Sequence, residues 1–152
     1  MSWQQASARA AATAATLALL AAAVAHAAVP TQVIHVKLED PSVDPSVKKM
    51  EIALDRHTVK AGRVTLEAVN LSKSLVHEVL VLHDPGKKAL PYDAKNAEVD
   101  ENRVHSLGEV GDLPPGHSGT LTLNLKPGKY LLFCNESGHY ADGMRTELTV
   151  TP

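Results

Sequence analysis

Residues 134–144 read CNESGHYADGM and hold three side chains that can bind a soft metal ion. Cys134, His139 and Met144 are each separated from the next by four residues, and Cys134 is the only cysteine of the chain. Thiolate and thioether sulfur favour soft metals, and two histidines with one cysteine and a weak axial methionine form a blue-copper site. The segment therefore predicts three of the four ligands of such a site.

The missing ligand is a second histidine from another part of the chain. His77 is the strongest candidate, because it lies in the apolar segment LVHEVLVLH at 75–83, where an unpartnered imidazole would be costly. The other histidines of the exported part lie near its beginning, at the end of this segment, or in and beside polar turns: His35, His83, His57, His105 and His117. Taken alone, His77 is as compatible with a hydrogen-bonded core histidine, Cys134 with a buried inert thiol and Met144 with core packing.

These residues carry a resemblance to a known family. NLSKSLVHEVLVL and KPGKYLLFCNESGHYADGM resemble the cupredoxins, the small blue copper proteins, and the similarity extends over residues 48–152. It implies a Greek-key β-sandwich that binds one copper ion, cycling between Cu(I) and Cu(II). It also implies that His77, Cys134 and His139 are the equatorial ligands and Met144 the axial ligand.

The chain departs from the family pattern at two positions near the expected ligands. Ser137 stands where members often have a proline before Gly-His, which leaves the expected loop less rigid. Glu78 stands where members often have an asparagine after the first histidine. A carboxylate cannot donate hydrogen bonds as an amide does, so the surroundings of the metal must differ.

The remaining sequence predicts an all-β domain of seven or eight strands. Apolar alternation favours strands at 31–38, with Val33 and His35 on one side, and at 48–55, 63–70, 75–83, 104–110, 118–125, 129–134 and 145–152. In 63–70 we expect Val64, Leu66 and Ala68 to face inward. Residues 84–103 break this rhythm and suggest a short helix near 93–98. This segment is either a surface for partner recognition or a tolerated insertion.

The first 27 residues have the order of an export signal: one positive charge at Arg9, an alanine-rich apolar run, and small residues before a cut after Ala27 or Ala28. A retained anchor or an alanine-rich helix of the fold are the alternatives. We therefore expect a signal peptide at 1–27 and a single copper-binding domain at 28–152. The export signal predicts a periplasmic or otherwise exported protein.

Charge and composition exclude some classes of partner. The chain has a formal charge of −2, and removal of residues 1–27 would leave −3. With no basic stripe, we expect neither nucleic-acid binding nor membrane insertion of the mature chain. An unpaired cysteine in an oxidising compartment is inert, paired between chains, or bound to metal.

The resemblance implies a one-electron carrier that acts between protein redox partners, as a monomer, and is not an enzyme. His139 would then present its ring edge to partners, beside Tyr140 and Ala141. The alternative is a periplasmic copper carrier or resistance protein that delivers or sequesters copper. Such proteins tend to use exposed sites rich in methionine and histidine, so Cys134 favours the electron carrier. A copper enzyme would need a further copper centre between domains, which one short domain does not supply.

Overall fold

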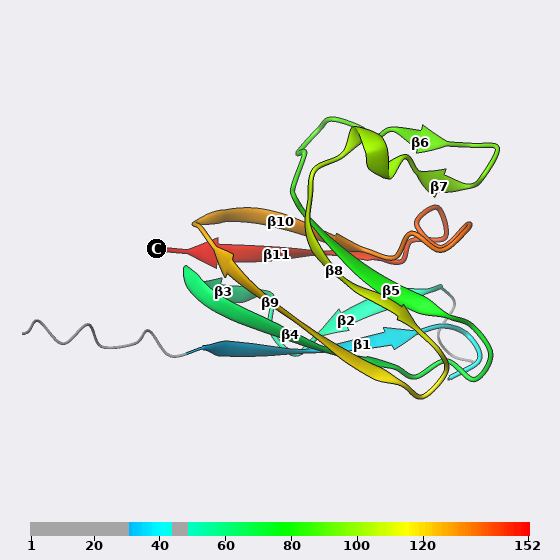
Figure 1. Cartoon of the computed structure of the whole chain (residues 1–152), viewed down its shortest axis with the longest axis horizontal. Helices are drawn as coiled ribbons and strands as arrows, with labels where there is room; N and C mark the ends of the chain where they lie inside the picture. Colours follow the sequence, from blue (N-terminus) through cyan, green and yellow to red (C-terminus); the bar gives the residue numbers. More distant parts are fainter. Residues whose placement is uncertain (1–30, 44–48) are drawn as a thin grey trace, which may run out of the picture.

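The computed structural model describes residues 31–43 and 49–152, which fold as two β-sheets packed face to face (Figure 1). The predicted signal peptide lies outside the described residues. The strands are β1 (Gln32–Glu39), β2 (Glu51–Leu54), β3 (Thr58–Lys60), β4 (Gly62–Asn70), β5 (His77–His83), β6 (Tyr92–Asp93), β7 (Glu98–Val99), β8 (Ser106–Leu113), β9 (Ser118–Leu125), β10 (Gly128–Phe133) and β11 (Arg145–Thr151). One 3-10 turn, η1 (Glu101–Arg103), is the only helical element in these ranges.

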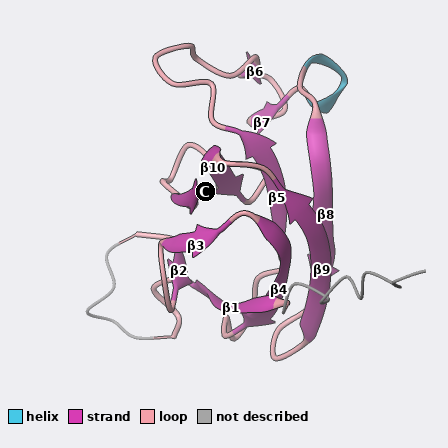
Figure 2. Cartoon of the chain, turned by 90° about the vertical axis from the view of Figure 1, so that its left-hand side faces the viewer, coloured by secondary structure: helices cyan, strands magenta, loops and turns pink. Residues whose placement is uncertain are grey.

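Strands that are neighbours in sequence often belong to different sheets. One sheet has the order β2-β1-β4-β9 and the other the order β3-β11-β10-β5-β8. The chain crosses between the sheets from β2 to β3, β3 to β4, β4 to β5, β8 to β9 and β9 to β10. Figure 2 shows β8 leading into β9 along one side of the molecule. The predicted all-β sandwich is confirmed, with one more strand in these two sheets than the eight predicted segments, because β3 forms a separate short pair with β11.

Alternating apolar residues place the core between the two sheets. On β4, Val64, Leu66 and Ala68 are buried, as predicted. On β1 the buried residues are Ile34, Val36 and Leu38, so the side shared by Val33 and His35 faces away from the core. Successive residues of a strand point to opposite faces, and the more continuous apolar set decides which face is buried.

Strand β5 is buried on both faces, and this explains its nearly unbroken apolar sequence. One face belongs to the main core, while Leu80 and Leu82 join Leu131 and Phe133 in a second cluster on the outer side of the sheet. Residues of the 84–104 segment cover this second cluster, with Val99 buried in it. The segment therefore completes the outer layer beside β5 and β10.

The predicted short helix near 93–98 is wrong. Strands β6 and β7 pair antiparallel there, with Tyr92 opposite Val99 and Asp93 opposite Glu98. Asp93 accepts hydrogen bonds from the backbone N–H of Lys95 and from the side chain of Asn96, which stabilises a turn instead of a helix. In Figure 1 this hairpin lies directly above the loop that follows β10. No helix within the described ranges is long and apolar enough to cross a membrane.

Candidate metal centre

Three predicted ligands come together at one end of the sandwich. His77 lies 57 residues before Cys134 in the chain, whereas His139 lies on the same loop as Cys134. His77 begins β5, Cys134 directly follows β10, and His139 lies on the loop between β10 and β11. Strands β5 and β10 are antiparallel neighbours, with Leu80 opposite Phe133, so the start of one lies beside the end of the other. The sheet pairing therefore brings the first histidine to the cysteine, and the loop adds the second histidine.

The three donor atoms form a small triangle. Nδ1 of His77 lies 3.2 Å from Nδ1 of His139, and Sγ of Cys134 lies 3.4 Å from His139 Nδ1 and 4.0 Å from His77 Nδ1. A circle through these atoms has a radius of about 2.1 Å, close to the roughly 2.0–2.3 Å of bonds from a metal ion to imidazole nitrogen and thiolate sulfur. The donor set fits a single metal ion bound at the centre of this triangle.

The three donor side chains are shielded from solvent, and this burial determines their protonation states in the metal-free protein. His77 and Cys134 are 0 % exposed and His139 is 8 % exposed. Burial lowers the pKa of both histidines and raises the pKa of the Cys134 thiol to about 12. The imidazoles are therefore neutral near pH 7 and can offer lone pairs, whereas the thiol must lose a proton before it binds a metal.

A buried carboxylate orients His77 from its other side. Oδ2 of Asp40 lies 3.2 Å from Nε2 of His77, and both side chains are almost fully buried. Burial raises the pKa of Asp40, but hydrogen bonds from Ser42, Ser72 and His77 outweigh it and lower the pKa to about 2. An ionised carboxylate only accepts, so Nε2 of His77 carries the proton and its Nδ1 lone pair points toward the triangle.

The loop at 134–144 closes on itself through its backbone. The N–H of Cys134 donates to the C=O of Met144 (3.0 Å), and the N–H of Met144 donates to the C=O of His139 (3.0 Å). Gly138 and Gly143 have φ of 87° and 97°, values that other residues adopt only with strain. Met144 is fully buried and packs in the main core cluster, with its backbone beside Cys134 and His139.

Glu78 takes part in the surroundings of the cysteine as an acceptor. Its Oε1 accepts a hydrogen bond from the backbone N–H of Asn135 (3.1 Å). Burial raises the pKa of Glu78 to about 7, against this hydrogen bond and with additional repulsion from Glu101, Asp112 and Glu109. An ionised carboxylate here only accepts, so the hydrogen bond that an amide at this position could donate is not available.

Asp40 and Asn135 are the contacts that the sequence did not reveal. Asp40 lies in the proline-containing linker EDPSVDPS, 37 residues before His77, and no spacing rule connects the two. Asn135 is visible only as a polar residue after the cysteine. Asp40 directly follows β1, which lies beside β4 in the sheet. Its position near His77 can be recognised only once this strand order is known.

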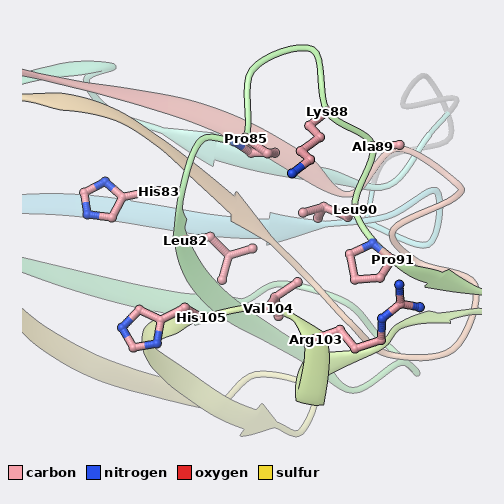
Figure 3. A pocket seen from close by; sticks show the side chains of 10 residues that line it. All are labelled: Leu82, His83, Pro85, Lys88, Ala89, Leu90, Pro91, Arg103, Val104 and His105. Atoms are coloured by element: carbon pink, nitrogen blue, oxygen red, sulfur yellow. The ribbon is translucent and has the colours of Figure 1, made fainter.

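The other histidines in the described ranges lie outside the triangle. His35, His57, His83, His105 and His117 are exposed, in agreement with the choice of His77. His83 and His105 line a separate pocket of about 410 Å³ between β5 and the 84–105 segment (Figure 3). The clustered residues His77, Cys134 and His139 do not line this pocket, so it is no part of the metal centre.

Comparisons with known proteins found relatives in structure alone. A scan against protein-family profiles found no match, and a search of curated proteins found none. Reduced auracyanin from the photosynthetic bacterium Roseiflexus castenholzii is 24 % identical with a TM-score of 0.56, over 83 % of this chain and 100 % of that one. Auracyanin B is 25 % identical with a TM-score of 0.54, over 82 % of this chain and 91 % of that one.

Rusticyanin gives the same result. The structure from Thiobacillus ferrooxidans is 19 % identical with a TM-score of 0.58, over 80 % of this chain and 77 % of that one. Auracyanin and rusticyanin are both cupredoxins, and the sandwich found here is theirs. The chain therefore has the cupredoxin fold, and its buried histidine–cysteine–histidine cluster fits a blue copper site.

Proposed function

We propose that this protein is a blue copper protein that carries single electrons between protein redox partners. His77, Cys134 and His139 are the proposed equatorial ligands of one copper ion, and Met144 is the proposed axial ligand. The observation that carries the proposal is the buried triangle of one thiol and two imidazole nitrogens, with edges of 3.2–4.0 Å. A donor set of this kind is typical of copper electron-transfer centres.

When bound there, copper would supply the one-electron change, and the protein's residues set the conditions for it. Cys134 would hold copper as a thiolate, with the proton of its thiol released to the solvent on binding. His77 is held by Asp40 in the tautomer that leaves Nδ1 free. Two paired strands and a hydrogen-bonded loop fix the positions of the donors, so little rearrangement accompanies a change of charge. The burial of all three residues excludes water.

His139 is the proposed point of electron exchange. It is the most exposed of the three clustered residues, at 8 %, and it is followed by the partly exposed Tyr140 and the exposed Ala141. A partner that docks over this loop would approach the ring of His139 more closely than that of His77. The electron donor and acceptor are proteins in this proposal.

The burial of the cluster favours electron transfer over copper delivery. A protein that hands copper to an acceptor needs ligands that the acceptor can reach, whereas Cys134 and His77 are 0 % exposed. We further propose that residues 1–27 direct export, with the domain at 28–152 acting as a monomer in the periplasm or another exported location. The order of charge, apolar run and small residues in 1–27 supports this part of the proposal.

Redox titration of the copper-loaded protein tests this function. We expect it to take up one electron per chain from ascorbate and return it to ferricyanide over repeated cycles, without loss of copper to a chelator. His139→Ala should slow electron exchange with a protein partner such as a c-type cytochrome, while His117→Ala, which changes an exposed histidine outside the cluster, should not. Release of copper on each reduction would instead support copper delivery.

A further inference from the structure

The 84–103 segment makes a dense set of hydrogen bonds to the loop that holds Cys134 and His139. Ser137 Oγ donates to the C=O of Asn96 (2.8 Å), and the N–H of Gly138 donates to the C=O of Ala97 (2.8 Å). The side chain of Asn135 makes the remaining hydrogen bonds with this segment. The bonds connect the 84–103 segment to three loop residues, Asn135, Ser137 and Gly138, which lie between the two clustered side chains.

Asn135 is the centre of this network. Its Oδ1 accepts from the N–H of Val99 (2.7 Å), while its Nδ2 donates to the C=O of Val99 (3.0 Å) and to the carboxylate of Glu101 (2.8 Å). Its own N–H donates to Glu78, the residue after His77. The side chain is buried, so an amide with all of these partners is costly to disrupt. One residue thus joins the segment of His77, the end of the Cys134 strand and the hairpin.

The backbone of the hairpin is strained where it meets the loop. Ala97 has φ of 58° and is the one non-glycine residue with a positive φ in the ranges 31–43 and 49–152. Its carbonyl is the one that accepts from Gly138. A strained conformation persists only where the surrounding contacts determine it, so the loop and hairpin hold each other in place.

Apolar contacts reinforce the same junction. Val99 is buried in the outer cluster with Phe133, the residue before Cys134. Tyr140, the residue after His139, packs edge-on against Phe133 with ring centroids 5.5 Å apart, and lies 6.1 Å from the ring of Tyr92 on β6. The hairpin therefore contacts the neighbours of both clustered residues on the loop.

We propose that the β6–β7 hairpin acts as a clamp: it holds the ligand loop, residues 134–144, in position. Asn135 is the main positioning residue of this clamp. It takes the role that a proline at position 137 would otherwise have, because Ser137 is tied to Asn96 through its hydroxyl. This inference rests on the proposed copper site for its consequence, but the clamp itself is a property of the metal-free protein. It also explains why the long connection between β5 and β8 is folded against the sheet.

The clamp is tested by amide hydrogen exchange of the metal-free protein. Asn135→Ala should speed exchange at Val99 and Gly138 by about tenfold, since local opening then needs fewer bonds broken. Ser137→Ala, at an exposed position, should produce a smaller increase at Gly138, and Ser137→Thr, which keeps the hydroxyl, should restore the wild-type rate. Ser106→Ala is the matched control, because its hydroxyl bonds to Gly108 on β8 and not to the loop.

The copper-loaded variants supply a second measurement. Asn135→Ala and Ser137→Ala should broaden the electron paramagnetic resonance signal of Cu(II), because the ligands then occupy a wider range of positions, while Ser137→Thr and Ser106→Ala should match the wild type. Wild-type exchange at Gly138 in both Asn135→Ala and Ser137→Ala would overturn the clamp. If Asn135→Ala does not fold, Ser137→Ala with its threonine rescue decides. A wild type that binds no copper would refute the proposed function. Amide hydrogen exchange of the metal-free protein would still test the clamp independently.

Discussion

The carboxylate of Asp40 lies 3.2 Å from Nε2 of His77, on the side of the ring opposite the cluster with Cys134 and His139. Both side chains are buried, and the pKa of Asp40 is lowered to about 2, so a full negative charge lies one imidazole away from the proposed copper position. Such a charge stabilises the more positive oxidation state of a bound metal. Asp40 therefore gives His77 its tautomer and should lower the reduction potential of copper bound at the proposed site.

Replacing Asp40 tests this electrostatic role. Asp40→Asn keeps the shape and an acceptor oxygen but removes the charge, so the site should bind Cu(II) less tightly relative to Cu(I). The reduction potential should then rise by about 60 mV for each tenfold loss of that preference for Cu(II). Redox titration followed by visible absorption measures it. Asp55→Asn removes the same charge from an exposed pair with Arg56 and should leave the potential unchanged. An equal shift in both variants would contradict the argument.

Copper binding should release about one proton per chain near pH 7. The pKa of the Cys134 thiol is about 12 in the metal-free protein, so the thiol is protonated, whereas burial lowers the pKa of both histidines and leaves them neutral. Because Cu(II) displaces that proton, the affinity should rise about tenfold for each pH unit between pH 7 and 9. Calorimetry in two buffers of different ionisation enthalpy measures the proton directly. Binding without proton release would show that Cys134 is not a ligand.

Glu78 should make the metal-free protein less stable as the pH rises. Its folded-state pKa of about 7 lies above the ordinary value of 4.5, so its contribution is fully present below pH 4.5 and is lost as the pH rises through 7. Glu78→Gln removes this loss. The free energy of unfolding of the variant minus that of wild type should therefore increase by about 1–3 kcal/mol when the pH is raised from 4.5 to 8. Urea denaturation at both pH values measures it. Glu51→Gln, at an exposed position, should show no such gain.

Substitutions at Met144 distinguish a role in core packing from a role as the axial copper ligand. Met144→Leu nearly conserves volume and should cost less than about 1.5 kcal/mol of stability, whereas Met144→Ala should cost about 2–5 kcal/mol because the residue is fully buried. If the thioether is the axial ligand, the leucine variant stays blue but its reduction potential changes, since the axial ligand tunes that potential. An unchanged potential would assign Met144 to core packing alone.

The sequence predicted the sandwich and the residues that gather at its end, because both depend on local patterns. Alternation gave the strands, and donor type with even spacing gave Cys134 and His139. His77 was found because an imidazole in an apolar strand needs a partner. Asp40 and the contacts of Asn135 depend on which strands become neighbours, and alternation within a strand carries no information on that.

The 84–103 segment shows a different limit. Its polar composition suggested a short helix, but the residues form a hairpin held by Asp93 at its turn and by the loop after Cys134 at its edge. Those loop contacts come from residues about 40 positions away in the chain. Tertiary contacts therefore overrode a weak local preference, and the two functions left open for this segment did not include support of the ligand loop.

The visible absorption spectrum of the copper-loaded protein tests the central claim most directly. A bond between Cu(II) and the Cys134 thiolate should make the wild-type protein intensely blue, and Cys134→Ser should remove the colour even where copper is still bound. A colourless wild-type Cu(II) protein, or a Cys134→Ser variant as blue as the wild type, would contradict a metal ion shared by this thiolate and the imidazoles of His77 and His139.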